Sequence, residues 1–281
     1  MRRTFAPRLV AWTLVATSMA AQPLIGQVTT PPEFRYVEVP GVILAYRDLG
    51  VGEPLLLLHG FGASGEVWAP FLDTLSSHFR VIVPDLRGHG RSTNPDGEFT
   101  HRQAARDVAA LLDSLGIVRV KAMGISTGGM TLLHLATSMA ERVEAMVLIG
   151  STSYFPEQAR EIMRRSHPDS MSAQELERAA SMHAGGAAQA RALRAQFHAF
   201  KDSYDDMNFT APLLSTIRAR TLIVHGDRDV FFPVEIPLEQ YRAIPHSYLW
   251  IVPNGGHVPL GTARRTEFLR IAFLFLSGAW N

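Results

Sequence analysis

The stretch that decides the fold runs from Val118 to Leu135 and reads VRVKAMGISTGGMTLLHL. Its apolar start, Val118 to Met123, predicts a buried strand, and the pattern from Met130 to Leu135 predicts a helix. Between them residues 124–128 read Gly-Ile-Ser-Thr-Gly, the GxSxG pattern of a sharp strand-to-helix turn. The two glycines let strand and helix pass closely. Such a turn lifts the Ser126 hydroxyl above the carboxyl edge of a sheet, beside the unpaired N–H groups of a helix N-terminus.

Composition narrows the class of protein. The chain has 281 residues, of which 47% are hydrophobic, so it can form one sizeable domain with an insertion or two small domains. The formal net charge is +1 and no basic run is present, so we expect no nucleic-acid partner. Cysteine is absent, which excludes disulfides, thiolate nucleophiles and thiolate metal ligands.

The N-terminus, residues 1–20, has the pattern of a signal peptide. Three arginines precede a short apolar segment at 9–16, and small residues stand at the −3 and −1 positions of a cleavage site after Ala20. The apolar segment is too short to span a bilayer, so we expect no stable membrane span. The sequence therefore predicts export to the periplasm or the medium, by the general secretory route in preference to a twin-arginine route. Residues 21–33 are expected to form a flexible leader.

Strands alternate with helices through residues 34–150 and 215–281, which predicts an α/β fold with a mostly parallel, doubly wound sheet. A hairpin around Pro40-Gly41 is expected at one edge. Besides the strand of the decisive stretch, the expected strands are 34–39, 42–48, 55–58, 81–83, 143–149, 220–225 and 248–252. The expected helices of this core are 67–77, 100–116, 264–276 and the one whose pattern runs through 130–135.

Residues 151–214 interrupt this alternation. They show helical patterns and no strand, with helices expected at 156–165 and 187–200 and a third that starts at Ser172, where Glu175 completes a capping box. A helical insertion between two sheet strands predicts a lid over the carboxyl edge of the sheet.

A serine hydroxyl needs a base to take its proton and an acid to orient that base. Loops that leave parallel strands open at the same edge of the sheet, so both partners should lie in such loops. The loop after residues 220–225 offers Asp227 and Asp229, and the loop after residues 248–252 offers His257. The candidate catalytic residues are therefore Ser126 and His257 with one of the two aspartates.

The chain resembles the α/β-hydrolase-fold superfamily, specifically its lidded serine esterase, haloperoxidase-like and lactonase group. The resemblance covers residue 34 to the C-terminus. It rests on motifs that match in order and spacing, namely His59-Gly60-Phe61-Gly62, Asp85 to Ser92, Gly124 to Gly128, Gly226 to Pro233 and Gly256-His257. The spacing of the acid in that family, three residues after the glycine and four before the proline, implies Asp229, with Asp227 as the alternative. The resemblance also places the oxyanion hole at the backbone N–H groups of Phe61 and Thr127.

Large apolar side chains near these motifs are candidates for the substrate pocket: Phe61, Trp68, Phe155 and Phe231. The other histidines show no metal-ligand spacing, so we expect no metal. We expect no cofactor either.

These features together predict an exported serine hydrolase that cleaves small to medium apolar carboxylic esters or lactones through an acyl-enzyme. Serine at the turn argues against the dehalogenase and epoxide hydrolase branches, which resemble this fold and use aspartate there. Carbon–carbon bond hydrolases, cofactor-free perhydrolases and amidases remain alternatives on the same residues. A ligand-binding protein of this fold is the alternative from a different class, and covalent labelling by a fluorophosphonate distinguishes it. The sequence leaves the oligomeric state open.

Overall fold

The structure is a computed structural model that describes residues 33–280. The expected signal peptide, residues 1–20, and nearly all of the expected leader, residues 21–33, lie outside the described residues, so both stay predictions.

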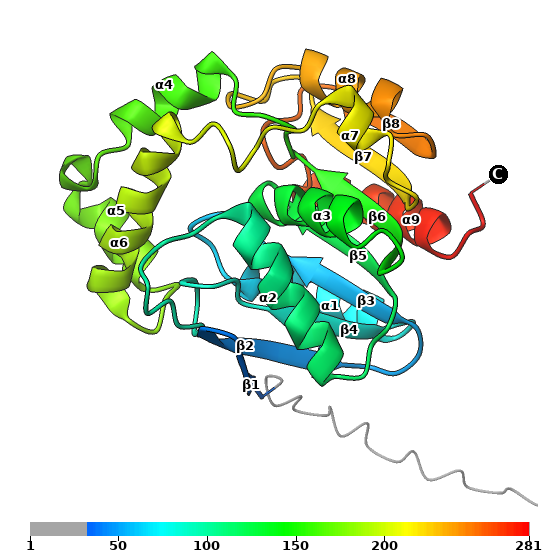
Figure 1. Cartoon of the computed structure of the whole chain (residues 1–281), viewed down its shortest axis with the longest axis horizontal. Coiled ribbons are helices and arrows are strands. Elements are labelled where there is room, and N and C mark those ends of the chain that lie inside the picture. The colour runs from blue at the N-terminus through cyan, green and yellow to red at the C-terminus, as the bar shows by residue number, and fades with distance from the viewer. Residues whose placement is uncertain (1–32, 281) are drawn as a thin grey trace, which may run out of the picture. The chain divides into compact units, whose positions relative to one another are not determined.

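A single eight-stranded sheet forms the centre of the described chain, in the order β1-β2-β4-β3-β5-β6-β7-β8 (Figure 1). The first two strands form an antiparallel edge hairpin, β2 also runs antiparallel to β4, and all other neighbours are parallel. This confirms the expected fold class. The strands are β1 (Arg35–Val39), β2 (Val42–Leu49), β3 (Pro54–Leu58), β4 (Arg80–Pro84), β5 (Val120–Ile125), β6 (Val143–Ile149), β7 (Arg220–Gly226) and β8 (Ser247–Val252).

Helices cover both faces of this sheet and create two apolar cores. Alternate leucines of β3 show the division: Leu56 and Leu58 join the core under α2, α3 and α8, whereas Leu55 and Leu57 join the core under α1 and α9. Strands buried on both faces explain why β3 and β6 are apolar without alternation. The helices are α1 (Ala69–Ser76), α2 (His101–Ser114), α3 (Thr127–Ser138), α8 (Glu235–Ala243) and α9 (Arg265–Leu276). Among the helices of residues 33–280, none is long and apolar enough to cross a membrane.

The insertion between β6 and β7 is helical, and α4 to α6 stand apart from the layers of the sheet (Figure 1). Its helices are α4 (Glu157–Arg165), α5 (Ala173–Ala180), α6 (Gly186–Ala199) and α7 (Ala211–Leu214). The capping box of Ser172 and Glu175 is present at the start of α5. Within the described insertion the only β pairing is an isolated bridge between Tyr154 and Asn208.

Strand β5 and helix α8 are among the elements that differ from expectation. Strand β5 begins at Val120, and Val118 is 78% exposed, so the apolar run overstates the strand by two residues. Helix α8 was not expected from the sequence. It contains Pro237 at its third position, where the missing backbone N–H costs nothing because the first turn of a helix has no intrahelical acceptor.

Candidate active site

Ser126 lies between β5 and α3 in a backbone conformation that side chains rarely adopt, with φ 49° and ψ −113°. Its surroundings enforce this conformation through close backbone packing. A Cβ atom at Gly124 would overlap the backbone of Gly128, and one at Gly128 would overlap the carbonyl of Leu58 in β3. The GxSxG glycines are therefore required because three backbone segments meet beside Ser126.

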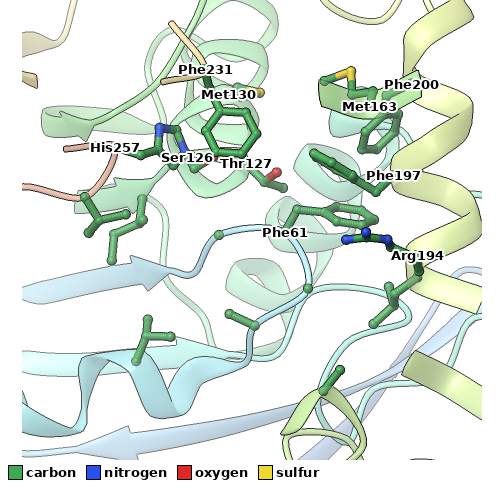
Figure 2. Close-up of a pocket in the computed structure, with 18 of the residues that line it drawn as sticks. Phe61, Ser126, Thr127, Met130, Met163, Arg194, Phe197, Phe200, Phe231 and His257 are labelled. Atoms are coloured by element: carbon green, nitrogen blue, oxygen red, sulfur yellow. Dashed lines mark hydrogen bonds between the residues drawn. The ribbon is translucent and has the colours of Figure 1, made fainter. Parts of the chain in front are cut away.

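The three polar side chains expected from the sequence form one hydrogen-bonded chain. The Nε2 of His257 lies 2.9 Å from the Oγ of Ser126, and the Nδ1 of His257 lies 2.8 Å from the Oδ2 of Asp229. Ser126 follows β5, Asp229 follows β7 and His257 follows β8, so residues from three loops meet at the carboxyl edge of the sheet. Figure 2 shows His257 beside Ser126.

Asp229 is held rigidly, with its side chain fully buried. Its Oδ1 accepts hydrogen bonds from the N–H of Phe231 at 2.8 Å and of Phe232 at 3.2 Å, which leaves Oδ2 for His257. The alternative acid, Asp227, has a side chain 32% exposed and lies 4.0 Å from the guanidinium of Arg228. The structure therefore places Asp229, and not Asp227, next to the imidazole.

A second histidine supports the loop of Asp229. The Nε2–H of His225 donates to the carbonyl of Phe232 at 2.9 Å, and the same nitrogen lies 3.6 Å from the Oδ2 of Asp229. Burial lowers the pKa of His225, which favours the neutral ring. A neutral His225 leaves the negative charge of Asp229 to the imidazole of His257.

The loop at residues 59–62 lies against Ser126, since a Cβ atom at Gly60 would stand 3.6 Å from the Cβ of Ser126. His59 fixes this loop: its Nδ1–H donates to the carbonyl of Gly60 at 2.8 Å, and its Nε2 accepts from the N–H of Leu86 at 2.9 Å. Burial lowers the pKa of His59, so the neutral tautomer that these bonds need is favoured. Phe61 and Thr127, the expected oxyanion-hole residues, both line the cavity beside Ser126. Thr127 begins α3, where its N–H has no intrahelical acceptor.

A cavity of about 470 Å³ opens above Ser126 between the sheet edge and the insertion. Its lining is mostly apolar, and Phe61, Phe155 and Phe231 all belong to it. Figure 2 labels ten of its residues, among them Met130 at the start of α3 and Met163 of α4.

The expectation that Trp68 also lines this pocket is corrected by the structure. Trp68 is fully buried in the core under α1 and α9, where its ring packs edge-on against Phe71. Although Trp68 stands only seven positions after Phe61, it ends a short 3₁₀ helix, Gly65–Trp68, and its side chain enters the opposite core.

Three basic side chains of the lining were not expected from the sequence: His101, His183 and Arg194. The Nδ1 of His101 lies 2.6 Å from the Oδ2 of Asp206, and the Nδ1 of His183 accepts from the N–H of Gly90 at 3.0 Å. More than 90 residues separate the partners of each contact, and neither pair belongs to a short motif. The described residues contain no cluster of three or more histidine, aspartate or glutamate side chains suited to hold a metal ion.

Comparison with known proteins places this geometry in a family. A family model described as the alpha/beta hydrolase fold matches residues 53–182. The described chain superimposes on an esterase from Rhodococcus sp. ECU1013 with a TM-score of 0.71 and 25% identity, over 87% of this chain and 98% of that one. The chain has the α/β-hydrolase fold and is similar to members of that superfamily.

Curated members of this superfamily resemble the chain over most of its length. A 2-hydroxy-6-oxo-6-(2'-aminophenyl)hexa-2,4-dienoic acid hydrolase from Metapseudomonas resinovorans is 26% identical over 79% of this chain and 84% of its own length. A pimeloyl-[acyl-carrier protein] methyl ester esterase from Vibrio atlanticus is also 26% identical, over 78% of this chain and 93% of its own length. This α/β hydrolase is thus related both to an esterase and to a hydrolase of a keto acid.

Proposed function

We propose that this α/β hydrolase is a serine esterase that cleaves small to medium apolar carboxylic esters or lactones. The observation that carries the proposal is the hydrogen-bonded chain of Ser126, His257 and Asp229, at 2.9 Å and 2.8 Å, beside a mostly apolar cavity. A hydroxyl, an imidazole and a buried carboxylate in this order activate a serine for attack on a carbonyl carbon.

The chemistry proceeds in two halves. His257 takes the proton of Ser126 as the Oγ attacks the ester carbonyl, and the N–H groups of Phe61 and Thr127 stabilise the oxyanion. Asp229 keeps the proton of the neutral imidazole on Nδ1 and stabilises the imidazolium that forms. His257 then protonates the leaving alcohol, and water, activated by the same imidazole, releases the acid from the acyl-enzyme. No step requires a metal or a cofactor.

Replacement of the nucleophile tests this proposal. Purified Ser126→Ala is expected to lose at least about a thousandfold in kcat/KM for 4-nitrophenyl esters of short and medium acids, because no acyl-enzyme can form. A fluorophosphonate probe should label the wild-type chain at Ser126, as peptide mass spectrometry would show, and leave the variant unlabelled. A folded wild-type chain that neither turns over these esters nor reacts with the probe would be a ligand-binding protein instead.

The two aspartates of the loop after β7 provide a matched comparison. Asp229→Asn should reduce kcat by about four orders of magnitude, because an amide donates to Nδ1 and favours the wrong tautomer of the imidazole. Asp227→Asn should leave kcat within about twofold, because its carboxylate is partly exposed beside Arg228 and the imidazole of His257 pairs with Asp229 instead. Equal losses in both variants, measured with the same ester, would remove Asp229 from the proposed role.

A second candidate function is hydrolysis of a carbon–carbon bond, and the keto-acid hydrolase among the relatives favours it. A 2-hydroxy-6-oxo-dienoic acid contains no ester or amide bond, so water can divide its chain only at carbon–carbon bonds. An assay of a 2-hydroxy-6-oxo-dienoic acid beside an ester panel separates the two functions by their kcat/KM values.

Export completes the proposal. Expression of the full chain in a bacterial host should yield a periplasmic or secreted protein whose N-terminal sequencing starts at Ala21, because the residues around Ala20 fit a signal peptidase site. Recovery of an uncut chain in the cytoplasm alone would contradict this assignment.

A further inference from the structure

Arg194 of α6 is the one side chain with a permanent charge in the lining of the described cavity. The remaining polar side chains of the lining are Ser126, Thr127 and the histidines His101, His183 and His257, and no aspartate or glutamate of the described chain belongs to it. A fixed positive charge in a mostly apolar cavity favours the binding of an anion.

Half-buried Arg194 makes no side-chain hydrogen bond or salt bridge with another described residue. Its Nε is buried and has no hydrogen-bond partner. The acid nearest in effect is Glu175, whose pKa is lowered mainly by its hydrogen bonds to Ser172 and only slightly by the charge of Arg194. Glu175 is exposed, and its Oε2 accepts hydrogen bonds from the N–H and the hydroxyl of Ser172, both at 2.8 Å, in the capping box of α5. By contrast, the guanidinium of Arg160 donates to three backbone carbonyls of residues 200–203.

The position of Arg194 indicates which part of a substrate it meets. In Figure 2 its guanidinium points into the cavity near the rings of Phe61 and Phe197, whereas Ser126 and His257 lie on the other side of the cavity. A substrate whose ester lies at Ser126 therefore extends past aromatic walls toward Arg194.

We propose that Arg194 binds a free carboxylate at the far end of the acyl chain, so that the substrates are half-esters of dicarboxylic acids. A guanidinium offers paired N–H donors that match the two oxygens of a carboxylate. The apolar walls between the two ends suit the hydrocarbon chain of such an acid. This inference rests on the proposed esterase function and adds the chemical class of the substrate.

A matched pair of esters tests the inference. Hydrolysis of monomethyl suberate, which carries a free carboxylate, is compared with that of methyl octanoate, which has the same chain length and no charge. Arg194→Met should raise KM for monomethyl suberate so that kcat/KM falls about 10- to 100-fold, the usual worth of a charged hydrogen-bonded pair. The same variant should leave kcat/KM for methyl octanoate within about threefold. Arg194→Lys should recover part of the loss because it keeps the charge.

Arg191→Met is the control variant, since Arg191 lies on the same helix with an exposed side chain outside the lining. It should leave kcat/KM unchanged for both esters, and thermal unfolding should show that all three variants fold. Equal losses for the charged and the neutral ester in Arg194→Met, or no loss for either, would overturn the inference while the esterase function stands. If the wild-type chain hydrolyses neither ester nor any 4-nitrophenyl ester, the proposed function itself fails.

Discussion

At Ser126 the chain holds a residue with φ 49° in a region that costs side chains about 1 to 3 kcal/mol. The close packing of the backbones of β3, β5 and α3 around Ser126 holds the residue in this conformation. The strain presents the Oγ to Nε2 of His257 at 2.9 Å. The geometry of Ser126 therefore depends on Gly124 and Gly128, which carry no side chain.

This dependence makes Gly128 a sensitive position. Gly128→Ala should lower the free energy of unfolding by about 3 kcal/mol, because the added methyl group overlaps the carbonyl and side chain of Leu58. Any folded fraction should hydrolyse esters more slowly, since the backbone must move apart to fit the methyl group and this displaces Ser126. Urea denaturation and ester assays measure both effects.

Gly261→Ala is the control, because a Cβ atom there meets nothing within 4 Å and its φ is −54°. It should change the free energy of unfolding by about 0.5 kcal/mol or less. A similar response of the two variants would show that close backbone packing is not the cause.

The structural elements meet at a second buried carboxylate, which joins the insertion to the core. Asp206 accepts hydrogen bonds from the N–H groups of His101 at 2.7 Å and Arg102 at 3.0 Å, the first residues of α2, and from the Nδ1–H of His101 at 2.6 Å. Its backbone carbonyl accepts from the Nε2–H of His134 in α3 at 2.7 Å. The segment that follows α6 is thus fixed to the helices on one face of the sheet.

Asp206→Ala should therefore lower the free energy of unfolding by about 2 to 4 kcal/mol, because it leaves several buried donors without an acceptor. Asp205→Ala, at the exposed neighbouring position, should change it by about 0.5 kcal/mol or less. The KM for an ester, relative to that of the wild type, should rise in Asp206→Ala and not in Asp205→Ala, since the insertion forms one wall of the cavity. Similar denaturation midpoints for the two variants would contradict the role of Asp206.

The elements that the sequence predicts are those set by local chemistry. The turn at Ser126 follows from its glycines, the start of α5 from Ser172 and Glu175, and β3 from a continuous apolar run. Contacts between distant segments leave no such mark. The pairing of His101 with Asp206 joins residues 105 positions apart, and the side to which Trp68 turns depends on a 3₁₀ helix that the apolar pattern does not reveal.

Several histidines are buried in the described part of the molecule, where the neutral form of the ring is favoured. Burial lowers the pKa of each of them, namely His59, His89, His134, His183 and His225, and the pKa of His134 falls to about 4. The nearby charges of Asp206, His101 and Arg102 modify the pKa of His134 less than burial does. All of these rings lower stability in acid for the same reason: a charged ring is disfavoured in the core, where it has no water around it.

The pH dependence of folding follows from these shifts. An unfolded histidine binds a proton below about pH 6.5, whereas folded His134 resists protonation until about pH 4, so the unfolded state binds more protons in this window and stability falls as pH falls. His134 alone should remove about 3 kcal/mol between pH 6.5 and 4. Asp206, with a pKa lowered to about 2, adds a further loss below about pH 4, because its charged form stabilises the fold.

The Tm measured between pH 7.5 and 4.5 should therefore change little above about pH 6.5 and decline below it. His134→Gln should flatten that decline, because a glutamine can still donate to the carbonyl of Asp206 and does not titrate, whereas His246→Gln, at an exposed site, should leave the slope unchanged. The difference in slope between the two variants isolates the buried ring from the general rise in net charge at low pH. Identical slopes in the wild type and His134→Gln would show that His134 is protonated in the folded chain well above pH 4.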